Sequence, residues 1–214
     1  MMLMIRLLLL VAVMSLFPVT SRGTTAVRGP ASPLALYQAL VRTPFVAREL
    51  PHGFVARPQP EATSGGPHGT IGEVGFRIDG PASGAVGTID VILYGVLRTD
   101  RDARTMFAAG PQAVFNPRDH RIIGVRATRL LGRPARLITV QVTNINGSGG
   151  VGIAGYTYCS VRVGTVIVTG GSGILGDRTS GNTAAALALA RAAVAHLVAV
   201  QHPPHAGAPQ GRTL

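Results

Sequence analysis

The sequence predicts an α+β domain: a single antiparallel sheet of about six strands packed by N-terminal, middle and C-terminal helices. Apolar segments that alternate with polar residues recur along the chain, and short Gly-rich turns join them. Helical spacing of apolar residues occurs near the start, the middle and the end. Hydrophobic residues make up 46% of the chain and charged residues only 14%, which favours an ordered domain. Strands joined by short turns favour an antiparallel sheet over alternating βαβ units.

Capping residues and apolar spacing predict the three helices. The first begins after Ser32, with a proline in its first turn, and ends at Arg42. The second is capped by Thr99, has carboxylates in its first turn and stops at Gly110. The third covers Ser180–Val200, where apolar residues at helical spacing stand on an Ala-rich background. This last helix should lie across the sheet.

Period-two patterns predict the strands. The six segments are Val74–Ile78, Val86–Leu97, Ile122–Leu131, Ala135–Thr143, Val151–Val163 and Thr165–Thr169. The stretch Leu50–Gly69 is rich in proline and glycine and lacks periodicity, which predicts a long surface connection. A Gly-rich loop is expected to join the last strand to the last helix.

The N-terminus reads as an export signal. One cation, Arg6, precedes an apolar run that ends at Phe17, too short to span a bilayer but typical of a signal peptide. Small residues allow cleavage after Ser21 or after Ala26, and an uncleaved anchor is the alternative. The predicted organisation is a signal peptide at 1–26, one α+β domain at 27–200 and a flexible tail at 201–214. The expected location is secreted or at the cell envelope.

The charge balance favours anionic partners. The chain has 20 basic residues, all arginine, against 9 acidic ones, a formal net charge of +11. An exported protein with this excess would meet anionic envelope polymers, lipid headgroups or another protein. Nucleic acid is less favoured because the arginines are scattered and no aromatic stacking platform accompanies them.

A glycine-rich motif covers Thr169–Gly176 and follows an apolar strand. It resembles the TGxxGxxG element of short-chain dehydrogenases, whose glycines let a pyrophosphate approach a helix N-terminus. A dinucleotide fold needs an acidic residue about 20 positions further on, but none follows Asp177, and the lysine of that family's catalytic pair is absent. We therefore predict no NAD site and no cofactor.

Other candidate chemistry is sparse. No serine lies in a GxSxG nucleophile elbow, so a secreted hydrolase would have to use scattered polar residues. These are His52, His68, Asp90 and His120. The only histidine grouping, His196, His202 and His205, matches no ordinary metal-ligand spacing. Asp100 and Asp102 lack the further ligands of a calcium loop and fit a helix N-terminus better. No catalytic, cofactor-binding or metal-binding residue is assigned.

Two isolated features have mainly structural interpretations. Cys159 is the only cysteine and lies in a predicted buried strand, where it would act as a small hydrophobe. Intermolecular pairing or a reactive thiol are the alternatives. Asn146-Gly147-Ser148 satisfies a glycosylation sequon formally and is interpreted as a hairpin tip.

The order of elements is similar to that of known exported domains. The run Tyr158–Val168 leading to Ala184–Leu197 resembles the end of PsbP-like α/β sandwich domains and of actinobacterial exported sensor domains and lipoproteins. The resemblance is architectural, covers about Leu34 to Val200, and implies ligand or protein binding without catalysis. Those sensor domains usually carry paired cysteines, and the lipoproteins a lipobox. This chain has neither, so no site residue is carried over.

The function expected from the sequence is an exported, non-catalytic binding or accessory domain that engages an anionic envelope component or a protein partner. The alternative is a secreted hydrolase of unrecognised type.

Overall fold

The computed structural model describes residues 32–81, 88–111, 120–143, 153–175 and 181–203. The predicted signal peptide, the sequon and all but the start of the predicted tail lie outside these ranges. These residues form three α-helices: α1 (Pro33–Arg42), α2 (Asp100–Ala109) and α3 (Thr183–Gln201). The caps predicted for the first two helices are confirmed: Ser32 accepts a hydrogen bond from Ala35 N and Thr99 accepts one from Asp102 N.

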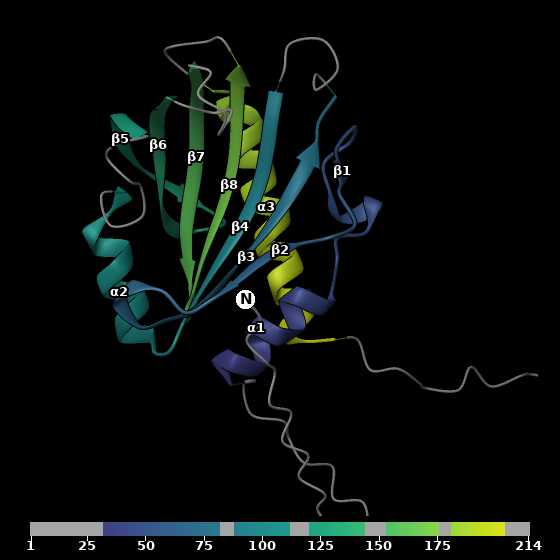
Figure 1. Cartoon of the computed structure of the whole chain (residues 1–214), viewed down its shortest axis with the longest axis vertical. Coiled ribbons are helices and arrows are strands. Elements are labelled where there is room, and N and C mark those ends of the chain that lie inside the picture. The colour runs from purple at the N-terminus through teal and green to yellow at the C-terminus, as the bar shows by residue number, and fades with distance from the viewer. Residues whose placement is uncertain (1–31, 82–87, 112–119, 144–152, 176–180, 204–214) are drawn as a thin grey trace, which may run out of the picture.

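One antiparallel sheet of eight strands forms the body of the molecule (Figure 1). The strands are β1 (Val55–Ala56), β2 (Glu61–Ser64), β3 (Thr70–Asp79), β4 (Thr88–Leu97), β5 (His120–Leu130), β6 (Arg133–Thr143), β7 (Ile153–Val163) and β8 (Val166–Leu175). Their order is β1-β3-β4-β8-β7-β6-β5, and β2 also pairs with β3. The α+β class and the single antiparallel sheet are therefore confirmed.

The prediction of six strands was an undercount. Both extra strands, β1 and β2, lie in the stretch Leu50–Gly69 that was expected to be a surface connection. All four residues of β2 are exposed, and β1 has only two residues, so neither shows an alternating apolar pattern. They are strands only because β3 offers them backbone hydrogen-bonding groups.

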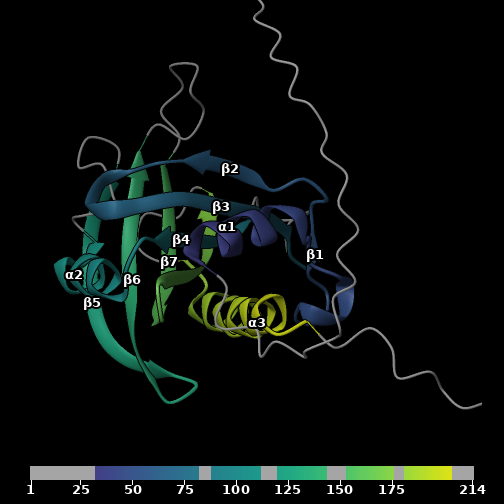
Figure 2. The ribbon, with the colours of Figure 1, turned by 90° about the horizontal axis from the view of Figure 1, so that it is seen from below.

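The main core lies between the sheet and helices α1 and α3, around which the sheet curves (Figure 2). Alternate residues of each strand enter it, for example Val74 and Phe76 of β3 and Ile92 of β4. By length and composition α3 could cross a membrane, and half of that stretch is buried inside the fold. Its apolar character thus serves the core, and the expectation that it lies across the sheet is confirmed.

The glycine run Thr169–Gly176 was predicted to be a loop, and that prediction was wrong. β8 continues through Gly170, Gly171 and Gly173 as a central strand paired with β4 and β7. A Cβ at Gly170 would lie 2.3 Å from Ala190 N in α3. On the other face, a Cβ at Gly171 or Gly173 would lie within about 2.6 Å of a tyrosine ring of β7. These glycines let a helix and two aromatic rings lie flat against the strand, a role with no relation to phosphate binding.

Candidate binding site

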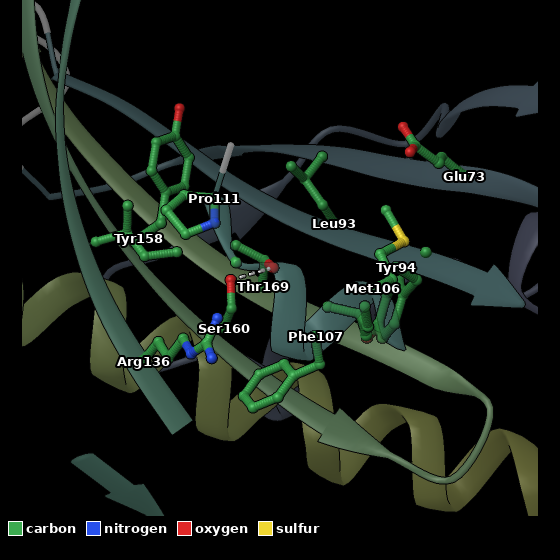
Figure 3. Close-up of a pocket in the computed structure, with 14 residues that line it drawn as sticks. Glu73, Leu93, Tyr94, Met106, Phe107, Pro111, Arg136, Tyr158, Ser160 and Thr169 are labelled. Atoms are coloured by element: carbon green, nitrogen blue, oxygen red, sulfur yellow. Dashed lines mark hydrogen bonds between the residues drawn. The ribbon is translucent and has the colours of Figure 1, made fainter. Parts of the chain in front are cut away.

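A pocket lies on the face of the sheet opposite α3, beside α2 (Figure 3). Strand register places Arg136, Ser160, Thr169 and Leu93 in one row across β6, β7, β8 and β4. Because directly opposed residues of neighbouring antiparallel strands share a face, all four side chains project toward this side. Met106 and Phe107 of α2, together with the start of the following segment at Gly110 and Pro111, form the wall.

Gly95 opens the pocket. It is opposite Ile167 in the sheet register, and a Cβ added to it would meet only Ile167 O, at 3.9 Å. The missing side chain thus leaves space that no neighbouring group fills. The cavity volume is about 90 Å³, and its lining is mostly apolar. Because a bound water needs polar partners, a lining of this kind suits one small apolar group better than ordered water.

Few polar side chains line this cavity. The hydroxyl oxygens of Ser160 and Thr169 are 2.8 Å apart and hydrogen-bonded to each other, as the dashed line in Figure 3 shows. The Arg136 guanidinium lies 4.9 Å from the centroid of the Phe107 ring and donates to Ala108 O at 3.3 Å. The Glu73 carboxylate is on the opposite side of the pocket.

Helix α2 is fixed over the sheet by charge and capping. Asp100, in its first turn, forms ion pairs with Arg104 and with Arg162 of β7. Carboxylates are favoured at this position because the helix dipole is positive at its N-terminus. The interpretation of Asp100 and Asp102 as helix-terminal residues is confirmed: Asp102 N donates to Thr99 Oγ1, and its carboxylate accepts a bond from that hydroxyl at 2.7 Å.

The four polar residues of the hydrolase alternative do not gather at this pocket. His68 lies just before β3, at the opposite end of the β3–β4 hairpin from Asp90. His120 begins β5, which is separated from the β4 strand of Asp90 by β8, β7 and β6. Four strand spacings correspond to about 19 Å. His52 is exposed in the turn that precedes β1.

The histidine grouping is also divided. His196 is buried inside the main core, His202 is exposed, and His205 lies outside the described residues. His196 Nδ1 lies 3.1 Å from a Glu49 carboxylate oxygen, and Nε2 lies 3.1 Å from Thr43 O. A carbonyl oxygen cannot donate, so Nε2–H donates to Thr43. Within the described ranges, no three potential metal ligands of the His, Cys, Asp or Glu type lie together.

Cys159 is fully buried in the main core, which confirms the predicted strand position. Burial raises the pKa of its thiol to about 11, although the charge of Arg191 acts in the opposite direction. The thiol is therefore protonated at neutral pH and unsuited to nucleophilic chemistry.

Asp90 is a buried carboxyl group that is incompletely paired. It is only 4% exposed, and its Oδ1 has no hydrogen-bond partner in the described structure. Burial raises its pKa above the usual 3.8; the charge of Asp79 adds to this, and a hydrogen bond from the Ser172 side chain opposes it.

We predict that the Asp90→Asn variant changes the pH dependence of stability. The folded protein keeps the Asp90 proton to a higher pH than the unfolded chain does, so wild-type stability falls as pH rises from 3.8 through the raised pKa. The variant lacks this loss, so its unfolding free energy should increase relative to that of the wild type across this pH range. Urea unfolding of both proteins at a series of pH values from about 3.5 to about 7 measures the difference between their unfolding free energies. Parallel curves would contradict the prediction.

A scan of protein-family models found no family that matches this chain, and a search of curated proteins found no match. The site must therefore be interpreted from its own geometry. Sequence reasoning did not identify Arg136, Ser160, Thr169 or Gly95. The alternating pattern within each strand indicates which residues share a face of the sheet. Which of these residues meet in one pocket depends on the order and register of the strands.

Proposed function

We propose that this protein is an exported, non-catalytic binding domain whose pocket accepts a small apolar group that carries an anionic substituent. The half-buried guanidinium of Arg136 at an apolar pocket is the observation that supports this proposal most directly. Export rests on the sequence of the first 26 residues.

The apolar part of the proposal follows from the walls. Leu93, Ile138 and Ile167 from the sheet face Met106 and Phe107 from α2. Burying apolar surface against such walls contributes about 25 cal/mol per Å². The small volume limits the inserted group to a short alkyl chain or one ring, so the rest of a larger ligand would lie outside the cavity.

The anionic part follows from charge. Arg136 has no carboxylate partner among the described ion pairs, and its guanidinium is held by the Phe107 ring and by Ala108 O. A guanidinium carries five N–H donors, so Arg136 can still donate to a carboxylate or phosphate oxygen. Ser160 and Thr169 are the polar residues of the pocket floor. No histidine or cysteine is among the lining residues, and the lining carboxylate, Glu73, is on the opposite side of the pocket, which supports binding rather than nucleophilic chemistry.

The test compares three six-carbon probes: hexanoate, hexan-1-ol and hexylamine. Methyl chemical shifts of Leu93 and Ile138 report the titrations. We expect hexanoate to bind with a Kd in the millimolar range, as suits about eight heavy atoms, and to bind more tightly than the alcohol. Preferential binding of hexylamine, which Glu73 would attract, or unsaturable shifts would overturn the proposal.

Two variants and one control sharpen this test. Gly95→Val should fill the cavity and weaken all three probes, since its Cβ meets no close neighbour. Arg136→Gln should weaken hexanoate about three- to tenfold and leave hexan-1-ol unchanged, as expected for one charged pair. Arg191→Gln removes an exposed arginine from α3, on the opposite side of the sheet, and should have no effect.

A further inference from the structure

The strand β5 forms one edge of the sheet. It pairs with β6, and no other described strand pairs with it. Only Leu130 among its eleven residues is buried, and Ile123 and Val125 are 49% and 48% exposed. Such an edge offers a row of backbone N–H and C=O groups to an incoming strand. This surface is separate from the pocket, so its role does not depend on the function proposed above.

The hairpin of β5 and β6 is strongly basic. Residues 120–143 contain no aspartate or glutamate and five arginines: Arg121, Arg126, Arg129, Arg133 and Arg136. None of these arginines forms an ion pair within the described residues. The chain elsewhere places carboxylates beside its strand arginines, as in the pairs Arg57–Asp79 and Arg77–Glu61. The excess of positive charge without neighbouring carboxylates is therefore a local property of this hairpin.

Register shows where the charges and the apolar side chains of β5 lie. Arg126 is opposite Leu137, which faces the main core, whereas Val125 and Arg129 are opposite Ile138 and Pro134 on the pocket side. A β-bulge between Ile122 and Gly124 interrupts the regular ladder. The regular segment 125–129 thus presents one arginine on each face of the sheet and one exposed apolar side chain.

We propose that the β5 edge binds an extended acidic segment of another protein by strand addition. In an antiparallel pairing, the residues opposite Arg129 and Arg126 are three positions apart and the residue opposite Val125 comes next. The segment therefore has the pattern acidic-x-x-acidic-apolar. A second copy of this chain is disfavoured, because pairing β5 with itself brings arginines of both copies together along the same short edge.

The test uses the full mature protein and a nine-residue peptide, Ser-Thr-Glu-Val-Thr-Glu-Val-Thr-Ser, that carries this pattern. A matched peptide has Gln in place of both Glu residues, and a third is N-methylated at successive backbone positions, which removes the N–H donors from both of its edges. At low salt, fluorescence anisotropy should show the acidic peptide binding about five- to tenfold more tightly than the Gln peptide, as expected for two exposed ion pairs. The N-methylated peptide should not bind, because it cannot form the ladder.

The protein variants distinguish strand addition from general attraction of anions. The double variant Arg126→Gln with Arg129→Gln should lose the preference for the acidic peptide, while Arg191→Gln, on α3, retains it. Amide exchange of residues 125–129 should slow when the peptide binds. Equal binding of the N-methylated peptide would show attraction by charge alone and overturn the proposal. A dimer in sedimentation whose β5 amides are protected would overturn it as well.

Discussion

Gly170→Ala is expected to lower the free energy of unfolding by about 3 kcal/mol, the upper part of the range for overpacked cores. The added Cβ would lie 2.3 Å from Ala190 N and 2.7 Å from Ala186 O, both backbone atoms of α3. Backbone atoms of a packed helix cannot turn aside as a flexible side chain can. The helix must therefore move away from β8, and contacts across the main core weaken with it.

Gly95→Ala is the matched control. Gly95 lies in β4, directly beside β8, and its added Cβ would meet only one atom, at 3.9 Å. Its effect on unfolding should lie within about 0.5 kcal/mol of zero. Chemical denaturation of the two variants and the wild type makes the comparison. Similar losses at both positions would show that glycine in this sheet matters for its backbone alone and that α3 does not press on Gly170.

His196→Ala is expected to cost about 3 kcal/mol of unfolding free energy, a loss typical of a large buried side chain that also carries hydrogen bonds. The imidazole is 1% exposed, stacks on Phe45 with ring centroids 4.1 Å apart, and bonds to both Glu49 and Thr43. Its removal leaves a cavity and unpaired partners where α3 meets the segment after α1.

His202→Ala supplies the control for this second variant, because His202 is exposed at the end of α3 and should tolerate the change. His196→Gln should fall between the wild type and the alanine variant, since an amide can donate to only one of the two oxygens from a similar position. A small effect of His196→Ala in thermal and chemical unfolding would contradict the view that this residue joins the two segments.

The prediction of elements succeeded where the signal is local. Ser32 and Thr99 could be recognised as helix caps because each side-chain oxygen accepts a hydrogen bond from the backbone N–H only three residues later in the chain. The alternating residues of β3 and β4 gave their buried faces for the same reason. The polar strand β2 and the glycines of β8 carry no such pattern, and both were misassigned.

The candidate site could not be predicted because its residues come from five strands and one helix. Arg136 and Leu93 lie at opposite ends of a row that exists only once β8 and β7 are placed between β4 and β6. The sequence around Gly95 did not indicate a pocket, because the space beside this residue is bounded by residues that are distant in the sequence. His196 gave a misleading one, because its sequence neighbours in the tail are not its partners in the fold.

The sequence by itself determined the α+β class, the three helices, the buried position of Cys159 and the basic character of the chain. Tertiary structure decided what the glycines of β8 do, which residues line the pocket, and that the arginines of the β5 edge form no ion pair within the part of the chain that the structure describes. The division has a physical reason: capping and alternation are set by neighbours along the chain, whereas cavities, close approaches and ion pairs depend on which distant segments lie opposite each other.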